Sequence, residues 1–106
     1  MPKYLVRASY TSEGTKGLIK DGASGRQAVA KKVVESVGGS IEAFYYALGD
    51  TDLVIILDVP DSSTAAAISL TVAAAGGVRT STTPLLTVQE MDAACKKQGT
   101  YRAPGA

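Results

Sequence analysis

The chain has 106 residues, enough for one domain with a single hydrophobic core and too few for two. Its 11 Lys and Arg against 10 Asp and Glu leave a net charge of +1, so no strong field draws it to nucleic acid or to an anionic membrane. Because histidine is absent, most zinc, haem and Ser-His-Asp sites are excluded, and we expect no metal and no cofactor.

Cysteine usage and hydropathy predict where the protein works. The single Cys95 cannot form an internal disulfide, and no signal-peptide pattern precedes Lys3, which is typical of a reducing compartment. No apolar run approaches the roughly 20 residues of a membrane span. We therefore expect a soluble, cytoplasmic protein without membrane or nucleic-acid partners.

The first elements are a strand and an interrupted helix. Tyr4–Tyr10 is predicted as a strand, and Thr11 begins a segment with helix-start residues. The glycines that follow are too many for one regular helix. The sequence predicts a short helix near Gly14–Lys20, a break, and a longer helix near Arg26–Val37, for which Ser24 and Gln27 form a capping box. Four valines of the longer helix fall at helical spacing: Val29, Val33, Val34 and Val37.

The segment Ile41–Val59 predicts two strands joined by Gly49–Asp52. Leu53–Leu57 is apolar at every position, whereas a half-buried strand alternates apolar and polar residues. This sheet is therefore expected to be covered on both faces, and a chain with few helices needs another subunit for the second face. Asp50 and Asp52 fit turn formation better than a cation site, because calcium takes six or more oxygens.

The last third of the chain predicts helix, strand and helix. Asp61 and the two serines after it cap a helix that runs to about Ala75. Val78–Thr83 reads as a strand because of its β-branched residues. Thr87 with Glu90 predicts a capping box for a short helix over Val88–Lys96. We place a single domain at residues 1–96 and a flexible tail at 97–106, and we interpret Cys95 as a packed or partly exposed thiol.

The order β-α-β-β-α-β with an extra C-terminal helix predicts an α+β, ferredoxin-like sandwich with a four-stranded antiparallel sheet. Both long helices then cover one face of the sheet and leave the other bare. A two-fold homodimer that packs sheet on sheet, or a higher oligomer of such dimers, is the simplest cover for that face.

Three segments resemble a known family: PKYLVRASYTSEGTKG, IEAFYYALGDTD and VRTSTTPLLT. Together they are similar to the GYD domain family, which is grouped with the dimeric α/β-barrel superfamily, over roughly residues 2–94. Gly49 and Asp52 match the outer positions of the name-giving motif, and Thr51 stands where the tyrosine is expected. The resemblance implies the ferredoxin-like dimer and no established activity.

Strand parity predicts which polar groups face the dimer. An unpaired charge against the helices costs several kcal/mol, so Arg7 and Asp58 are placed on the bare face, with Ser9 beside them. Tyr45 joins this face, opposite Ile56, if the Gly49–Asp52 loop has an even length. An odd loop brings Tyr46 there instead.

These positions give a candidate ligand site for a small anion or carboxylate, formed by Arg7, Ser9, Tyr45, Asp58 and Arg79. The simpler interpretation, which we favour at this stage, is that Arg7 pairs with Asp58 and that the tyrosine fills the dimer core.

A weaker anion site is formed by Lys20, Ser24 and Arg26 at the helix break. It matches neither GxxxxGK[ST] nor GxGxxG. A helix kink with solvated charges explains these residues more simply.

Two functional classes remain open. The first is a non-catalytic homo-oligomer that binds a small molecule or serves an assembly role. The second is a cofactor-independent enzyme, resembling small monooxygenases or isomerases of the same superfamily, with Tyr45 and Arg7 shaping its pocket. An RNA-binding platform is disfavoured, because the central third strand carries no aromatic residue.

Overall fold

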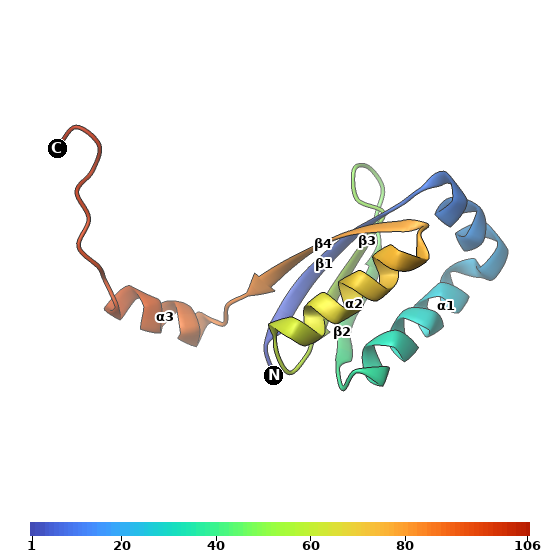
Figure 1. Ribbon diagram of the computed structural model, residues 1–106, viewed down its shortest axis with the longest axis horizontal. Coiled ribbons are helices and arrows are strands. Elements are labelled where there is room, and N and C mark those ends of the chain that lie inside the picture. The colour runs from blue at the N-terminus through green and yellow to red at the C-terminus, as the bar shows by residue number, and fades with distance from the viewer.

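The computed structural model describes residues 1–106 and contains a four-stranded sheet and three helices (Figure 1). The elements are β1 (Lys3–Tyr10), α1 (Ser12–Ser36), β2 (Ser40–Tyr46), β3 (Leu53–Asp58), α2 (Ser62–Ala75), β4 (Val78–Leu85) and α3 (Val88–Lys96). All neighbouring strands are antiparallel, in the order β2-β3-β1-β4. The predicted ferredoxin-like α+β fold is confirmed.

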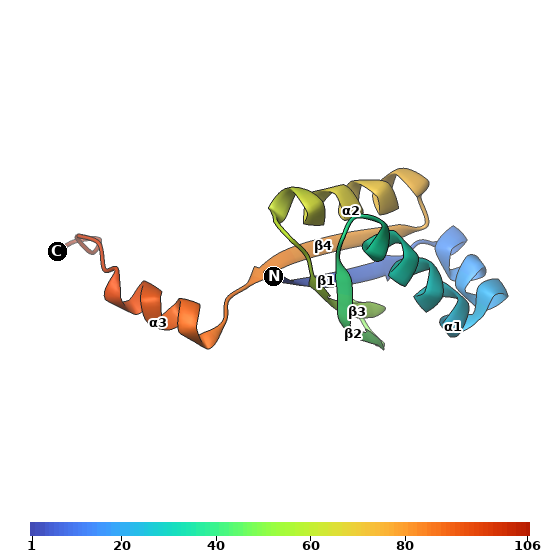
Figure 2. The same cartoon turned by 90° about the horizontal axis from the view of Figure 1, so that it is seen from below.

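The core lies on one side of the sheet. Alternate residues of β1 and β3 are buried there, among them Val6 and Leu57. They share one hydrophobic cluster with Val34 of α1 and with Ala65 and Ile68 of α2. Both long helices therefore cover the same face, as Figure 2 shows for α2 above the strands. We call the other face, which carries no helix, the open face.

The helix starts follow local capping chemistry. The Thr11, Asp61 and Thr87 side chains accept hydrogen bonds from backbone N–H groups three residues on, at the starts of α1, α2 and α3. At α3, Glu90 also accepts from the N–H of Thr87, which completes the predicted capping box.

The predicted break between two helices is confirmed and lies at Gly22, as a kink within α1. Gly22 has φ 79° and ψ 161°, a conformation that favours glycine, and helix continues on both sides of it. One glycine therefore absorbs the change in direction, and no Ser24–Gln27 cap forms. Val34 is the only buried residue of α1, and Val29 stays 45% exposed, so the valine face is less buried than its spacing predicts.

The hairpin between β2 and β3 fixes the face of each tyrosine. Tyr46 pairs with Leu53 and Tyr45 with Val54, so an even number of residues separates the paired ends. Tyr45 therefore lies on the open face, opposite Val54 rather than the predicted Ile56. A β-bulge between Ile41 and Ala43 shifts the register farther along the hairpin.

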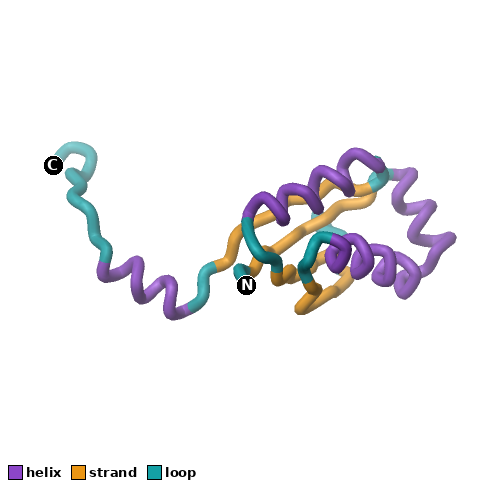
Figure 3. Tube along the Cα trace, turned by 60° about the horizontal axis from the view of Figure 1, so that its bottom comes forward, coloured by secondary structure: helices purple, strands orange, loops and turns teal.

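The residues after β4 do not pack against the sheet or the two long helices. Residues 86–106, which we call the C-terminal arm, contain α3 and are exposed throughout. Figures 1 and 3 show the arm projecting from the end of β4, away from the other helices. The principal extents are 57 × 33 × 22 Å and the radius of gyration is 17.0 Å, above the ~13 Å of a compact chain of this size. The sheet and its two helices thus form the folded body.

Candidate functional site

The open face has an apolar centre between two polar ends. Leu5 of β1 and the β3 residues Val54 and Ile56 occupy the centre, and each is only partly covered. One end carries arginines and hydroxyl groups, and the other carries an ion-pair cluster. The two ends therefore differ in charge and in partners.

At the arginine end, two strands bring cationic side chains together. In the β1–β4 pairing, Arg7 lies opposite Ser81 and Ser9 lies opposite Arg79. The two arginines are therefore diagonal neighbours on one face, ~7–8 Å apart. Neither guanidinium makes a salt bridge, although both side chains are long enough to converge on one anion.

These side chains border a shallow cleft of about 340 Å³. We call it the arginine cleft, and its lining is entirely polar: Arg7, Ser9, Thr51, Arg79, Thr80 and Ser81. Because serine and threonine hydroxyls donate hydrogen bonds, the cleft offers donors as well as positive charge to a carboxylate or phosphate. Its chemistry is that of anion binding.

The β2–β3 loop holds one wall of this cleft in place. The Ser9 hydroxyl donates to the carbonyl of Asp50 (2.9 Å), and the N–H of Tyr10 donates to the Asp52 carboxylate (2.8 Å). The N–H of Asp52 donates in turn to the carbonyl of Ala8 (2.9 Å). The two aspartates thus anchor the loop to the end of β1. No cluster of three or more acidic or cysteine side chains forms that could hold a metal ion.

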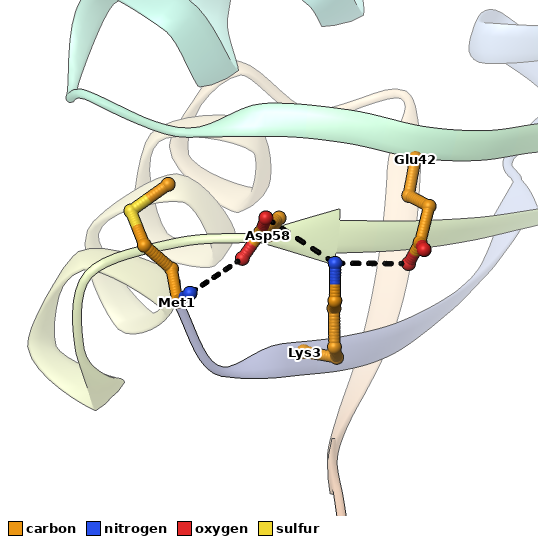
Figure 4. A network of polar contacts seen from close by, with 4 residues as sticks. All are labelled: Met1, Lys3, Glu42 and Asp58. Carbon is orange, nitrogen blue, oxygen red and sulfur yellow. Dashed lines mark ion pairs between the residues drawn. The ribbon is translucent and has the colours of Figure 1, made fainter. Parts of the chain in front are cut away.

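Asp58 lies at the opposite end of the open face. Its carboxylate contacts the Lys3 ammonium at 3.2 Å and the N-terminal ammonium at 3.5 Å, while Glu42 contacts the same lysine at 3.4 Å (Figure 4). The simpler interpretation, an Arg7–Asp58 pair, is therefore wrong. In the β1–β3 register Asp58 faces Lys3, and Arg7 faces Val54. Asp58 cannot orient a guanidinium of the arginine cleft from this position.

The contacts within this cluster change the pKa values of its two central groups, Asp58 and Lys3. Partial desolvation would raise the pKa of Asp58, but the hydrogen bond and charge of Lys3 outweigh it and lower that pKa. The Asp58 carboxylate raises the pKa of Lys3. One Asp58 oxygen, Oδ1, faces the N-terminus and has no hydrogen-bond partner. The cluster is a self-contained ion pair with no spare charge for a ligand.

Tyr45 stands at the β2 edge of the open face. It lies in one cross-strand row with Val54, Arg7 and Ser81, so β3 separates it from Arg7 by two strand spacings, ~10 Å. Its side chain is 70% exposed and makes no hydrogen bond within the chain. Tyr46 points the other way and donates its hydroxyl proton to the carbonyl of Ala23 in α1 (3.0 Å).

The residues of the second predicted anion site, Lys20, Ser24 and Arg26, do not converge on one point. Arg26 contacts the Asp21 carboxylate at 3.4 Å and lines a cavity between the helices. Ser24 borders a different depression, with Lys31 and Ser40, and Lys20 is exposed on the other side of the Gly22 kink. The three residues flank the kink without forming a common cradle.

Sequence reasoning missed three contributors to the open face. Thr51 and Ser81 line the arginine cleft, and Lys3 is the partner of Asp58. Strand alternation from Arg79 and from Arg7 leads directly to Ser81 and Lys3, so the signal was present in the sequence. Thr51 comes from a loop, where no periodicity indicates its direction.

Comparison with known proteins agrees with the fold. The GYD domain family matches residues 4–95 of the chain. A relative from Thermus thermophilus, named "Glutamine synthetase and cystathionine beta-lyase binding protein", is 28% identical over 96 residues, which cover 91% of this chain and all of the relative. No solved structure gives a significant match. No helix of the chain has the length and hydropathy needed to cross a membrane. Since the family match spans nearly the whole chain and the resemblance in three segments agrees with it, the chain belongs to the GYD domain family.

Proposed function

We propose that this chain is a non-catalytic, cytoplasmic binding protein that forms a homodimer through its open face and holds a small carboxylate or phosphate in the arginine cleft. The observation that carries this proposal is the open face itself. It combines an uncovered apolar centre with two arginines that have no acidic partner. The single exposed thiol of Cys95 suits a reducing compartment.

The apolar centre supports self-association. Only 10 of the 106 residues are buried, and Val54 and Ile56 in the middle of the sheet are only partly covered by their own chain. A second copy presents the same patch, so a two-fold axis between two open faces covers both apolar centres at once. The dimer adds to the hydrophobic core that the isolated chain has only on its helix side.

The arginines support an anionic ligand. When two sheets pack together, charges at their margin lose part of their hydration, which is costly unless the charges are paired. Lys3 and Asp58 satisfy this requirement with each other, but Arg7 and Arg79 do not. A bound anion provides the missing negative charge, and the hydroxyls of Thr51 and Ser81 provide further hydrogen bonds.

The relative in Thermus thermophilus supports a binding role of this general kind. Its name describes a protein that binds two enzymes, and the matched region includes the whole relative. By analogy, an assembly role with a protein partner belongs to the same proposal. The surfaces left outside the dimer, including the C-terminal arm, are where such a partner has access.

Oligomeric state tests the dimer. We expect analytical ultracentrifugation or native mass spectrometry of the full chain to show a dimer. Ile56→Arg places a charge in the apolar centre and should convert it to monomer. The matched control is Leu70→Arg on α2, because Leu70 is already 71% exposed on the helix side. A wild-type monomer at high micromolar concentration, or equal dissociation in both variants, would contradict the proposal.

Thermal shift tests the anion site. Phosphate or malonate should raise the melting temperature of the wild type and have little effect on Arg7→Ala or Arg79→Ala, with the dimer intact. Arg102→Ala, an exposed arginine in the C-terminal arm, is the control and should respond like the wild type. Loss of the dimer in Arg7→Ala would show that this arginine is structural and would overturn the site.

A second function is favoured by one observation. The Tyr45 hydroxyl has no partner within the chain and lies on the same face as Arg7. In a dimer that leaves an open interior, these groups are suited to a cofactor-independent enzyme, with the tyrosine as a hydrogen-bond donor to a substrate held by arginine. Turnover of a small carboxylate that is lost in Tyr45→Phe, with binding retained, would favour this function over simple binding.

A further inference from the structure

A cavity lies on the other side of the sheet, between α1 and α2. Its volume is about 100 Å³, and 14 of its 17 lining residues are hydrophobic. Ala8 of β1 and Ile55 of β3 form its floor. Val33 of α1 and Val72 of α2 form its walls. Since no residue of the arginine cleft except Thr80 borders it, it is a separate space from the open face.

The cavity exists because the two helices cover different edges of the sheet. α1 packs mainly over β2, and α2 packs over β4, so the side chains that the two helices extend over β1 and β3 leave a space between them. Val29, which lines this space, is 45% exposed. An apolar space without partner atoms forfeits dispersion contacts and destabilises the fold, so an apolar group that enters it is bound favourably.

One end of the cavity is polar. Tyr10, Arg26 and Val78 line both the cavity and an adjoining cleft beside Gly77, so the two spaces connect there. Arg26 is the only charged residue of the cavity wall. It lies 3.4 Å from Asp21, a long contact with a carboxylate that is itself exposed, and an incoming anion can compete for it. Glu13, the acid of the adjoining cleft, contacts Lys16 instead.

A pair of tyrosines accompanies this arginine. Burial and the neighbouring Tyr10 raise the pKa of Tyr46, and the Tyr46 hydroxyl donates to the carbonyl of Ala23. Tyr10 lines the mouth of the cavity, and its side chain lies beside that of Tyr46. The mouth thus combines one cation with a hydroxyl donor, above an apolar chamber.

We propose that this cavity binds a short monocarboxylate, with its aliphatic tail between α1 and α2 and its carboxylate on Arg26 and Tyr10. An apolar cavity on the order of 150 Å³ holds a benzene ring, so this smaller space fits an aliphatic tail of about three to five carbons. The charge at the mouth selects an acid over an alcohol or an amine. The site is independent of the dimer and of the arginine cleft.

The experiment compares acids of increasing length with neutral and cationic analogues of equal length. Titration of the full chain with acetate, butyrate, hexanoate and octanoate, followed by methyl NMR shifts of Val33 and Val72, should show saturable binding that is tightest for butyrate or hexanoate. Hexanol should bind at least about tenfold more weakly than hexanoate, because it loses the charge-assisted hydrogen bond to Arg26. Hexylamine should bind more weakly still, because its positive charge is repelled by the same arginine.

Two variants and one control locate the site. Arg26→Gln should weaken hexanoate binding about tenfold and abolish the preference over hexanol. Val33→Phe should fill the cavity and abolish binding while circular dichroism shows an intact fold. Arg79→Gln, on the opposite face of the sheet, should leave hexanoate binding unchanged, whereas it removes the phosphate response of the arginine cleft. The two proposed sites are therefore tested independently, so a negative result for one does not affect the test of the other.

Several outcomes would overturn the proposal. These are the absence of methyl shifts at 10 mM hexanoate, binding that persists in Val33→Phe, and methyl shifts at Val54, beside Arg7 on the open face, in place of Val33 and Val72. Methyl shifts that follow protein concentration without any acid would instead show that a second copy, through α3, occupies the cavity. Equal binding of hexanoate and hexanol by the wild type and Arg26→Gln would overturn the role of the arginine.

Discussion

The two faces of the sheet are made from the same strands and have opposite environments. In β3, Leu53, Ile55 and Leu57 are buried under the helices, while Val54 and Ile56, equally apolar, are only partly covered. The amino-acid types do not differ, so the difference comes from what packs on each side. The chain carries more apolar strand surface than its own helices cover, and the surplus is concentrated on one face, where it is available to a partner.

The largest expected effect separates two neighbouring residues of β3. Leu57 is 2% exposed, so Leu57→Ala removes buried atoms and should lower the free energy of unfolding by about 2–5 kcal/mol. Ile56→Ala removes a side chain that is only partly buried in the single chain, and should cost about 1 kcal/mol at concentrations where the chain is monomeric. Urea denaturation measures both values.

The concentration dependence of this pair sharpens the comparison. If a second copy covers the open face, the cost of Ile56→Ala grows as the protein concentration rises, and that of Leu57→Ala changes little. Equal costs for the two variants at every concentration would mean that the two faces are buried alike. In that case the surplus apolar surface would need another explanation.

A smaller effect is expected from the glycines that fit α1 to the body. A Cβ on Gly14 would lie 1.8 Å from the carbonyl oxygen of Gly77, a backbone atom in the turn after α2, whereas a Cβ on Gly17 meets nothing within 4 Å. Gly14→Ala should therefore destabilise by about 1–3 kcal/mol. Gly17→Ala should stabilise by about 0.5–1 kcal/mol through helix propensity.

These two alanines test whether the helix layer is rigidly placed over its face. Thermal unfolding of both variants at one concentration gives the comparison. If Gly14→Ala is as stable as the wild type, α1 can move relative to Gly77 without loss of stability. The packing of α1 on the sheet is then less rigid than the hydrogen bond from the N–H of Thr11 to the carbonyl of Gly77 (2.9 Å) implies. If Gly17→Ala destabilises instead, the first half of α1 packs against a partner.

How much of this could be predicted from the sequence depends on whether a feature is periodic. Alternation in β1 and β3 predicts the face on which Arg7 and Asp58 lie, because parity survives any shift by two residues. It does not predict position along the strand, which depends on the register. Alternation alone therefore predicts that Arg7 and Asp58 lie together, although they lie at opposite ends of the open face.

Features that depend on packing between elements were also out of reach. The number of glycines in α1 signals a change of direction, but only the backbone shows that Gly22 alone provides it. The spacing of Val29 and Val33 predicts an inward face, and the distance between α1 and α2 decides that this face borders a cavity. Helix separation is a property of the assembled body, and no local pattern encodes it.

The smallest expected effect concerns charge on the two sides of the sheet, measured as melting temperature against pH. Asp58 belongs to the open face, and Asp61 caps α2 on the helix side, where the Thr64 hydroxyl and N–H and the Ser63 hydroxyl lower its pKa. Both folded pKa values lie below the ordinary value of 3.8. Each carboxylate therefore stabilises the fold above that value, and this contribution is lost as the pH falls through the lower, folded pKa.

Two asparagine substitutions separate these contributions. Asp61→Asn keeps a capping oxygen and loses only the charge, so it should flatten the acid limb of the curve and leave the alkaline limb unchanged. Asp58→Asn also removes the nearer of the two carboxylates that contact Lys3 and leaves Glu42 in place. Because the pKa of Lys3 is raised in the folded state, its contribution is present below 10.5 and disappears as the pH rises through the folded pKa. Asp58→Asn should therefore flatten both limbs, each by at most about 5 °C. If the melting temperature of Asp58→Asn falls with rising pH as that of the wild type does, solvent screens the ion pair between Asp58 and Lys3 completely. This result is expected of an open face that no second copy covers.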